Sequence, residues 1–94
     1  MTAFEWDTDK AAANFAKHGV SFLEAETLFS DPLAILHDDP EHSSSEDRFV
    51  ALGQSYLGRI LFVVYAERRG VIRIISARKA TAGERRAYEE GGSR

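Results

Sequence analysis

The apolar and polar positions of the chain change their period several times, and each change predicts an element. Residues 4–6 alternate as in a short edge strand or a tucked-in arm, whereas apolar residues recur at helical spacing within residues 7–19 and again within residues 21–31. Four short apolar or alternating segments follow, separated by polar or glycine-containing turns, as is typical of strands. These segments are residues 33–36, 48–54, 59–67 and 71–79.

Two spacings mark where helices begin. Ser21 with Glu24, and Thr81 with Glu84, have the spacing of capping boxes. Gly19 marks the end of the first helix, because glycine readily takes the left-handed conformation of a C-cap. The apolar face expected for this helix is made by Ala12, Phe15, Ala16 and, beyond its end, Val20.

These elements predict an α+β fold. The short connections at residues 56–59 and 68–70 join the last three strands as an antiparallel meander. The first two helices form a hairpin whose apolar stripe needs a covering surface. We therefore expect residues 1–94 to form a single domain, with an N-terminal helical hairpin packed on a four-stranded, mainly antiparallel sheet and a C-terminal helix.

Composition excludes several classes of protein. The chain has no cysteine, which rules out disulfides, a thiol nucleophile and a cysteine zinc site. The longest apolar run, residues 60–66, is far shorter than the roughly 20 residues of a membrane helix. The N-terminus lacks the basic and apolar regions of a signal peptide. We therefore expect a cytoplasmic protein with no membrane partner.

Charge is distributed unevenly along the chain. Residues 1–47 contain 2 Lys or Arg against 11 Asp or Glu, whereas residues 48–86 contain 9 against 2. The net charge of −3 therefore hides a basic second half. Such asymmetry indicates a phosphate-bearing partner, although two solvated faces of opposite sign would give the same counts.

The most basic stretch joins the last strand to the C-terminal helix. Arg78 and Lys79 end this strand just before a helix N-terminus, where backbone N–H groups favour anions. Strict alternation would put Ile72, Ile74, Ser76 and Arg78 on one face, and Val71, Arg73, Ile75, Ala77 and Lys79 on the other.

Several separated motifs resemble the BrnT toxins of bacterial type II toxin–antitoxin systems. They span nearly the whole chain in the same order and spacing, and they are Phe4 to Asp7, Lys17 to Phe22 with Glu24 and Ala25, Asp31-Pro32, Asp47 to Phe49 with Leu52-Gly53, Val63 to Tyr65, Arg73 to Ala80, Glu84-Arg85 and Tyr88-Glu89. The resemblance implies a RelE-like fold and a ribonuclease that cleaves RNA without a metal or other cofactor and inhibits translation. It also implies a BrnA-type antitoxin with a ribbon-helix-helix part, in a complex of two toxins and two antitoxins that binds operator DNA through the antitoxin.

Metal-free RNA cleavage needs a base, an acid and positive charge at the phosphate. Arg78 and Lys79 are the candidates for phosphate stabilisation, since an arginine fork binds phosphate bidentately. Proton transfer could come from His18, Glu84 or Tyr88. Further contacts to RNA are expected from Arg48, Arg73 and Arg85.

Each candidate also has a purely structural interpretation. Glu84 completes a capping box, His18 suits a helix C-terminus, and Tyr88 suits the rim of a core. The exposed cations could be solvated surface residues, namely Arg48, Arg59, Arg68, Arg69, Arg85 and Arg86.

Two further hypotheses concern metals and partners. Residues 37–42 gather two His and three carboxylates, but their spacing matches no standard ligand motif and predicts a surface loop. A non-catalytic module that binds a partner protein is the alternative function. Tyr56, Tyr65 and Tyr88 lie in or beside the basic region and predict an apolar rim that an antitoxin shares with RNA.

Overall fold

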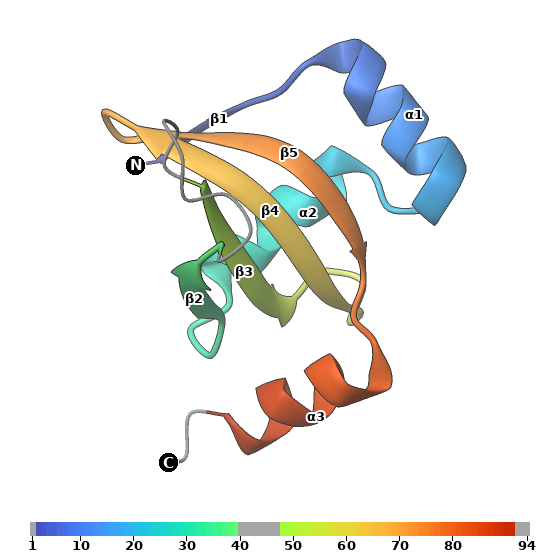
Figure 1. The fold of residues 1–94 in the computed structure, drawn as a ribbon, viewed down its shortest axis with the longest axis vertical. Helices are drawn as coiled ribbons and strands as arrows, with labels where there is room; N and C mark the ends of the chain where they lie inside the picture. The colour runs from blue at the N-terminus through green and yellow to red at the C-terminus, as the bar shows by residue number, and fades with distance from the viewer. Residues whose placement is uncertain (1, 40–47, 92–94) are drawn as a thin grey trace.

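A computed structural model describes residues 2–39 and 48–91 (Figure 1). Its helices and strands follow one another in the order that the sequence patterns predict, and a short 3₁₀ helix, η1, extends the second helix. The elements are β1 (Ala3–Glu5), α1 (Thr8–His18), α2 (Phe22–Thr27), η1 (Leu28–Ser30), β2 (Ile35–Asp38), β3 (Arg48–Gln54), β4 (Ile60–Arg68), β5 (Val71–Lys79) and α3 (Ala82–Glu90).

The described strands form one five-stranded sheet in the order β1-β5-β4-β3-β2. The predicted antiparallel meander is confirmed for β3, β4 and β5, and β2 adds to it antiparallel, two residues later in the chain than expected. The prediction of four strands is wrong, because β1 pairs in parallel with β5 and makes the sheet mixed. A three-residue parallel edge strand depends on a long-range pairing that local alternation does not specify.

One extra residue breaks the alternation along β5. Val64 of β4 pairs with Ser76, and the next residue of β4, Tyr65, pairs with Ile74. Ile75 is therefore the inserted residue of a β-bulge. An insertion of this kind moves the side chains that follow it to the opposite face of the sheet.

The bulge makes the predicted face assignment of β5 wrong beyond Ile74. Ile72, Ile74 and Ala77 all belong to the same buried core cluster. Arg78 instead lies on the opposite face with its cross-strand partner Phe62, whose ring its guanidinium covers.

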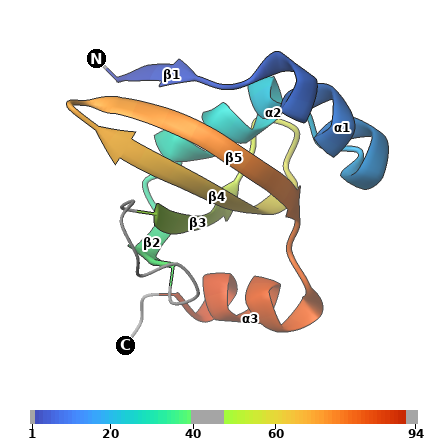
Figure 2. The same cartoon turned by 45° about the horizontal axis from the view of Figure 1, so that its top comes forward.

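Helices cover both faces of the sheet. Figure 2 shows α1 and α2 on one side of β4 and β5 and α3 on the other. The predicted helical hairpin is wrong, because α1 and α2 each pack mainly on β5 rather than on one another. The expected apolar face of α1 is confirmed only for Val20, which is fully buried beyond the end of the helix. It is wrong within the helix, since Phe15 is 57% exposed while Asn14 is buried.

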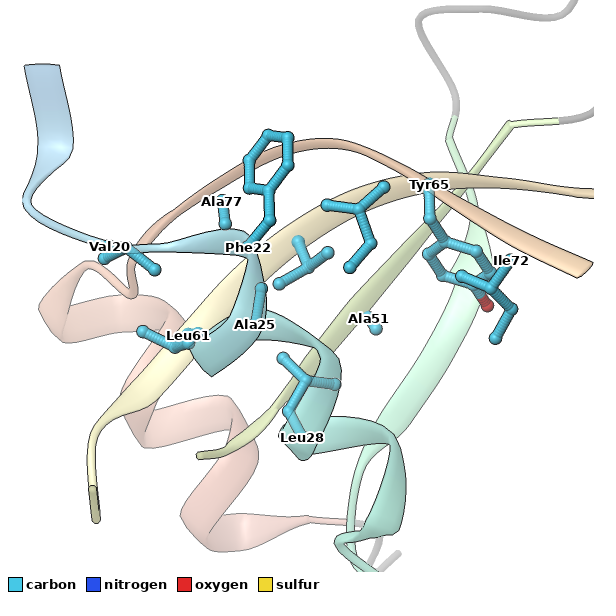
Figure 3. Close-up of a cluster of buried hydrophobic side chains, with 11 residues drawn as sticks. Val20, Phe22, Ala25, Leu28, Ala51, Leu61, Tyr65, Ile72 and Ala77 are labelled. Atoms are coloured by element: carbon cyan, nitrogen blue, oxygen red, sulfur yellow. The ribbon is translucent and has the colours of Figure 1, made fainter. Parts of the chain in front are cut away.

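The core lies between the sheet and the first two helices (Figure 3). Phe22, Ala25 and Leu28 of the α2 region meet the inward residues of β3, β4 and β5 there, as their helical spacing predicts. Tyr65 is only 3% exposed and stacks edge-on against Phe29 with the ring centroids 5.0 Å apart. Burial raises the pKa of Tyr65 to about 12. Its predicted place at an exposed rim is therefore wrong.

Within the described ranges, no helix is both long and apolar enough to cross a membrane.

Candidate functional site

Arg78 is held from three sides at the end of β5. Its Nη1 and Nη2 donate to Oε1 and Oε2 of Glu84 at 2.8 and 3.0 Å, the bidentate geometry of a guanidinium and a planar oxyanion. Nη1 also donates to the carbonyl oxygen of Lys79 at 3.2 Å. The guanidinium carbon lies 4.1 Å from the centroid of the Phe62 ring. These contacts use three of the five N–H groups of Arg78 and fix its plane.

The pair has a clear charge state. The hydrogen bonds from Arg78 are the largest cause that lowers the pKa of Glu84, with burial opposing and the Thr81 amide assisting. The same pair raises the pKa of Arg78. Glu84 also completes the predicted capping box, since its Oε1 accepts from the Thr81 amide at 2.9 Å. At neutral pH the site thus holds a charged fork and an ionised carboxylate.

Tyr88 lies one helical turn after Glu84 but bonds elsewhere. Its hydroxyl donates to Oδ2 of Asp31 at 2.6 Å, which ties α3 to the segment between η1 and β2. Burial and this hydrogen bond raise the pKa of Tyr88 to about 12. The same Oδ2 accepts from the Gln54 amide at 2.8 Å. Although burial works in the other direction, these hydrogen bonds leave the pKa of Asp31 below its ordinary value.

Cross-strand pairing places further arginines on the face of Arg78. Ala66 pairs with Arg48 on one side and Arg73 on the other, so the three form a row across β3, β4 and β5. Directly opposite residues share a face, and Ala66 shares its face with Phe62 four positions earlier. Nη1 of Arg73 also forms an ion pair with Oε2 of Glu5 at 3.2 Å. The bulge thus brings Arg73 and Arg78, which alternation placed apart, to one face.

The other predicted residues do not join this cluster. Lys79 is exposed and pairs across the sheet with the core residue Leu61, so its side chain begins on the opposite face from Arg78. His18 is half-buried in the last turn of α1, on the side of the sheet away from α3 (Figure 2). Arg85 is exposed on α3.

One buried ion pair was missed by sequence reasoning. Glu24 is 3% exposed and accepts hydrogen bonds from Nε and Nη2 of Arg59 and, at 2.7 Å, from the Ser55 hydroxyl. The bonds from Arg59 are the main cause that lowers the pKa of Glu24. The Ser21 hydroxyl caps α2 as predicted, but the carboxylate of Glu24 points to Arg59 instead of completing a capping box. An acidic residue between the inward-facing Phe22 and Ala25 was the available signal.

Asn14 is a second buried polar residue that the sequence did not single out. Its amide nitrogen donates to the carbonyl oxygens of Val20 at 3.1 Å and Ala77 at 2.8 Å, and its oxygen accepts from the Ala77 amide at 3.1 Å. These bonds fix α1 to β5 immediately before Arg78. An asparagine near the middle of a helix that otherwise reads as alanine-rich was the only hint.

The candidate metal cluster lies partly outside the described residues. Residues 37–39 are described, whereas residues 40–42 are not. In the described part of the chain, no three His or carboxylate side chains are grouped so that they could hold a metal ion.

The arrangement on the α3 side of the sheet has the parts that phosphate chemistry requires. An arginine fork is flattened on an aromatic ring and already binds one oxyanion, the carboxylate of Glu84. The ionised carboxylate of Glu84 contacts this fork, and the neutral phenol of Tyr88 follows one helical turn later on α3. An ionised carboxylate can only accept a proton and a neutral phenol can only donate one.

Comparison with known proteins identifies the family of this chain. The family model described as "Ribonuclease toxin, BrnT, of type II toxin-antitoxin system" matches residues 6–84. Among curated proteins, none matches the chain significantly. Among solved structures, the crystal structure of the Brucella abortus ribonuclease toxin BrnT is similar, with a TM-score of 0.65 and 25% sequence identity over 86% of this chain and 99% of that one. The chain therefore belongs to the BrnT family of ribonuclease toxins of type II toxin–antitoxin systems, with an RNA target and an antitoxin partner.

Proposed function

We propose that this chain is a metal-independent endoribonuclease that inhibits translation, with its reaction centre on the α3 side of the sheet. The proposal rests on one observation above all, the bidentate contact between Arg78 and Glu84 on the ring of Phe62. A fork that is held flat and binds a carboxylate in this way is also shaped to bind two oxygens of a phosphate. We assign phosphate stabilisation to Arg78. Lys79 remains a candidate for further positive charge from the end of the same strand, although its side chain begins on the opposite face of the sheet.

Binding of a phosphate at Arg78 would prepare Glu84 for proton transfer. Because the bonds from Arg78 are the main cause of the low pKa of Glu84, an RNA phosphate that takes over the fork raises that pKa. A carboxylate with a higher pKa is a better general base near neutral pH. Arg78 thus binds the substrate and, in doing so, releases the base.

The reaction is an in-line transesterification. The ribose 2′-oxygen forms a bond to the adjacent phosphorus and passes its proton to Glu84, while the bond from phosphorus to the 5′-oxygen breaks and that oxygen takes a proton from Tyr88. The products are a 2′,3′-cyclic phosphate and a 5′-hydroxyl end. Tyr88 is neutral at pH 7 and must first exchange its bond to Asp31 for one to the leaving group. His18 remains a candidate for proton transfer, but its place across the sheet favours the Glu84 and Tyr88 pair.

The RNA strand would follow the arginines on the same face. Arg48 and Arg73 lie in one row across the sheet, and Arg85 is exposed on α3 beside Glu84. These side chains supply the positive charge that single-stranded RNA needs.

The antitoxin is expected to be of the BrnA type, which carries a ribbon-helix-helix part. We propose a complex of two toxins and two antitoxins that binds operator DNA through the antitoxin. Analytical ultracentrifugation of the co-expressed pair measures this stoichiometry, and a mobility shift with operator DNA measures the second property.

The decisive experiment compares three forms of the purified chain on RNA in EDTA. We expect cleavage by the wild type and by Arg86→Ala, which removes an exposed arginine of the same helix. Arg78→Ala should lower kcat by about 100-fold or more, the usual effect of losing one stabilising donor. Addition of the antitoxin should stop cleavage by the wild type.

Two results would decide against this mechanism. Loss of wild-type cleavage in EDTA, restored by a divalent cation, would show metal-dependent chemistry. A wild-type chain that leaves RNA intact, does not slow growth when induced and still binds its antitoxin would be the non-catalytic interaction module.

A further inference from the structure

The turn between β4 and β5 closes a basic hollow at the opposite end of β5 from Arg78. The hollow has a volume of about 450 Å³ and is lined by Glu5, Ala66, Arg68, Arg69, Val71 and Arg73. The lining therefore holds three arginines and one carboxylate, that of Glu5. The ion pair between Glu5 and Arg73 is about half exposed on both sides, so it is weak and can open for a stronger anion.

Arg69 adopts a left-handed backbone conformation, which is unfavourable for a residue with a side chain. Its φ is 56°, and among the described residues it is the only non-glycine residue with a positive φ. Gly70 follows with φ 80°, so both central residues of this two-residue hairpin turn have the positive φ of a type I′ turn. Asn or Gly is the usual residue at the first of these positions, and an arginine there lowers stability. A strained residue that a turn does not require is a candidate functional residue.

The hollow lies on the same face of the sheet as the proposed reaction centre. Arg73 and Arg78 share this face because of the bulge in β5, and they are five residues apart. One of these five steps is the bulge, and their cross-strand partners Ala66 and Phe62 are four residues apart. At about 3.3 Å per residue, the Cα atoms of Arg73 and Arg78 are therefore separated by roughly 13 Å. At a rise of about 3.4 Å per nucleotide in a stacked strand, this distance corresponds to about four nucleotides, and to fewer in an extended strand.

We propose that this hollow is a second phosphate subsite, which holds a phosphate of the same RNA strand a few nucleotides away from the scissile one. The inference rests on the proposed function, since it assumes that the scissile phosphate lies at Arg78. Arg68 and Arg69 bind the phosphate from the turn, and Arg73 joins them when its pair with Glu5 opens. The subsite sets how the strand lies across the sheet and therefore which phosphate reaches Arg78.

The lining favours a phosphate over a protein segment. Its apolar residues are Ala66 and Val71, which are too small to form the deep pocket that a large apolar anchor of a protein partner fills. Arginine forks, in contrast, are the side chains that bind phosphate bidentately.

The test measures binding without relying on cleavage. The probes are a 12-nucleotide and a 3-nucleotide oligonucleotide of mixed sequence with 2′-deoxyribose throughout, which cannot undergo the reaction. Fluorescence anisotropy gives the Kd of each for the wild type, for Arg68→Gln with Arg69→Asn, and for Arg86→Ala as the matched arginine control.

We expect the paired variant to weaken binding of the 12-mer about tenfold. The ratio of the 3-mer Kd to the 12-mer Kd should fall accordingly, because the 3-mer is too short to contact both subsites. The slope of log Kd against log salt should fall by about 0.7 for the lost phosphate contact. Arg69→Asn alone should also raise Tm by about 5 °C, because asparagine suits the left-handed position. If Arg69 only stabilised the fold, its replacement would instead lower Tm.

An unchanged ratio of Kd values in the paired variant would overturn the proposal, whatever cleavage shows. The proposal would be equally wrong if the variant lost affinity for the antitoxin while its binding of the 12-mer stayed the same, since the hollow would then bind protein. If the wild type binds the 12-mer through these arginines but never cleaves RNA, the subsite stands and the ribonuclease mechanism fails.

Discussion

Replacement of Asn14 by alanine should destabilise this fold more than any surface change. Asn14→Ala removes three hydrogen bonds that join α1 to Val20 and Ala77. At about 1 kcal/mol each, and with a further 1 kcal/mol for a buried Ala77 amide left unpaired, the loss is about 4 kcal/mol. Alanine is the better helix former by about 0.6 kcal/mol, which leaves a net loss of about 3 kcal/mol.

This loss is large for a chain of this size. A domain of 94 residues is stable by only about 5–14 kcal/mol. At 4–8 °C per kcal/mol for a small domain, Tm should fall by roughly 15 °C. Urea unfolding followed by circular dichroism measures the free energy of unfolding, and hydrogen exchange measures the protection of the Ala77 amide.

Two controls separate hydrogen bonding from helix effects. Lys10→Ala changes an exposed residue of the same helix and should stay within about 0.5 kcal/mol of the wild type. Asn14→Asp keeps the shape of the side chain but loses its donor, so it should be at least as destabilising as alanine, because two carbonyl oxygens would then face a carboxylate. A loss below about 1 kcal/mol for Asn14→Ala, with the Ala77 amide still protected, would refute the reasoning.

Two further predictions concern titratable groups. The pKa of Glu24 is lowered in the folded chain, so the stability it contributes is complete above its ordinary pKa of 4.5 and is lost as pH falls below it. Glu24→Gln should therefore lower the free energy of unfolding by about 2 kcal/mol at pH 7, which is less than for a fully buried pair because the Arg59 side chain is 32% exposed. In urea unfolding, the difference in stability between this variant and the wild type should shrink as pH falls from 5 to 2. A difference that stays constant would contradict the prediction. Burial and the hydrogen bond to Asp31 raise the pKa of Tyr88 to about 12. Ultraviolet titration of Asp31→Asn should therefore show one tyrosine ionising nearer to pH 10 than in the wild type, and Tyr88→Phe identifies its signal. An unchanged titration would mean that the two groups are not in contact in solution.

Local patterns predicted much of this chain because their causes are local. The Thr81 and Glu84 capping box and the Gly19 C-cap each depend on residues within a few positions of one another, and both are present. The alternation of β3 and the tight turn at residues 69–70 likewise predicted the meander. The basic character of the second half followed from charge counts, and a strand end beside a helix N-terminus singled out Arg78 as a candidate.

The tertiary structure alone decided which of those residues meet. A single inserted residue, Ile75, reverses the facing of the rest of β5 and so moves Arg78 to the side of Arg73 and α3. Asn14 with Ala77 and Asp31 with Tyr88 are separated by 63 and 57 positions, too far for any local rule. Helix caps and turns depend on neighbours along the chain, which a sequence displays, whereas sheet register and buried hydrogen bonds depend on neighbours in space, which only the packed fold determines.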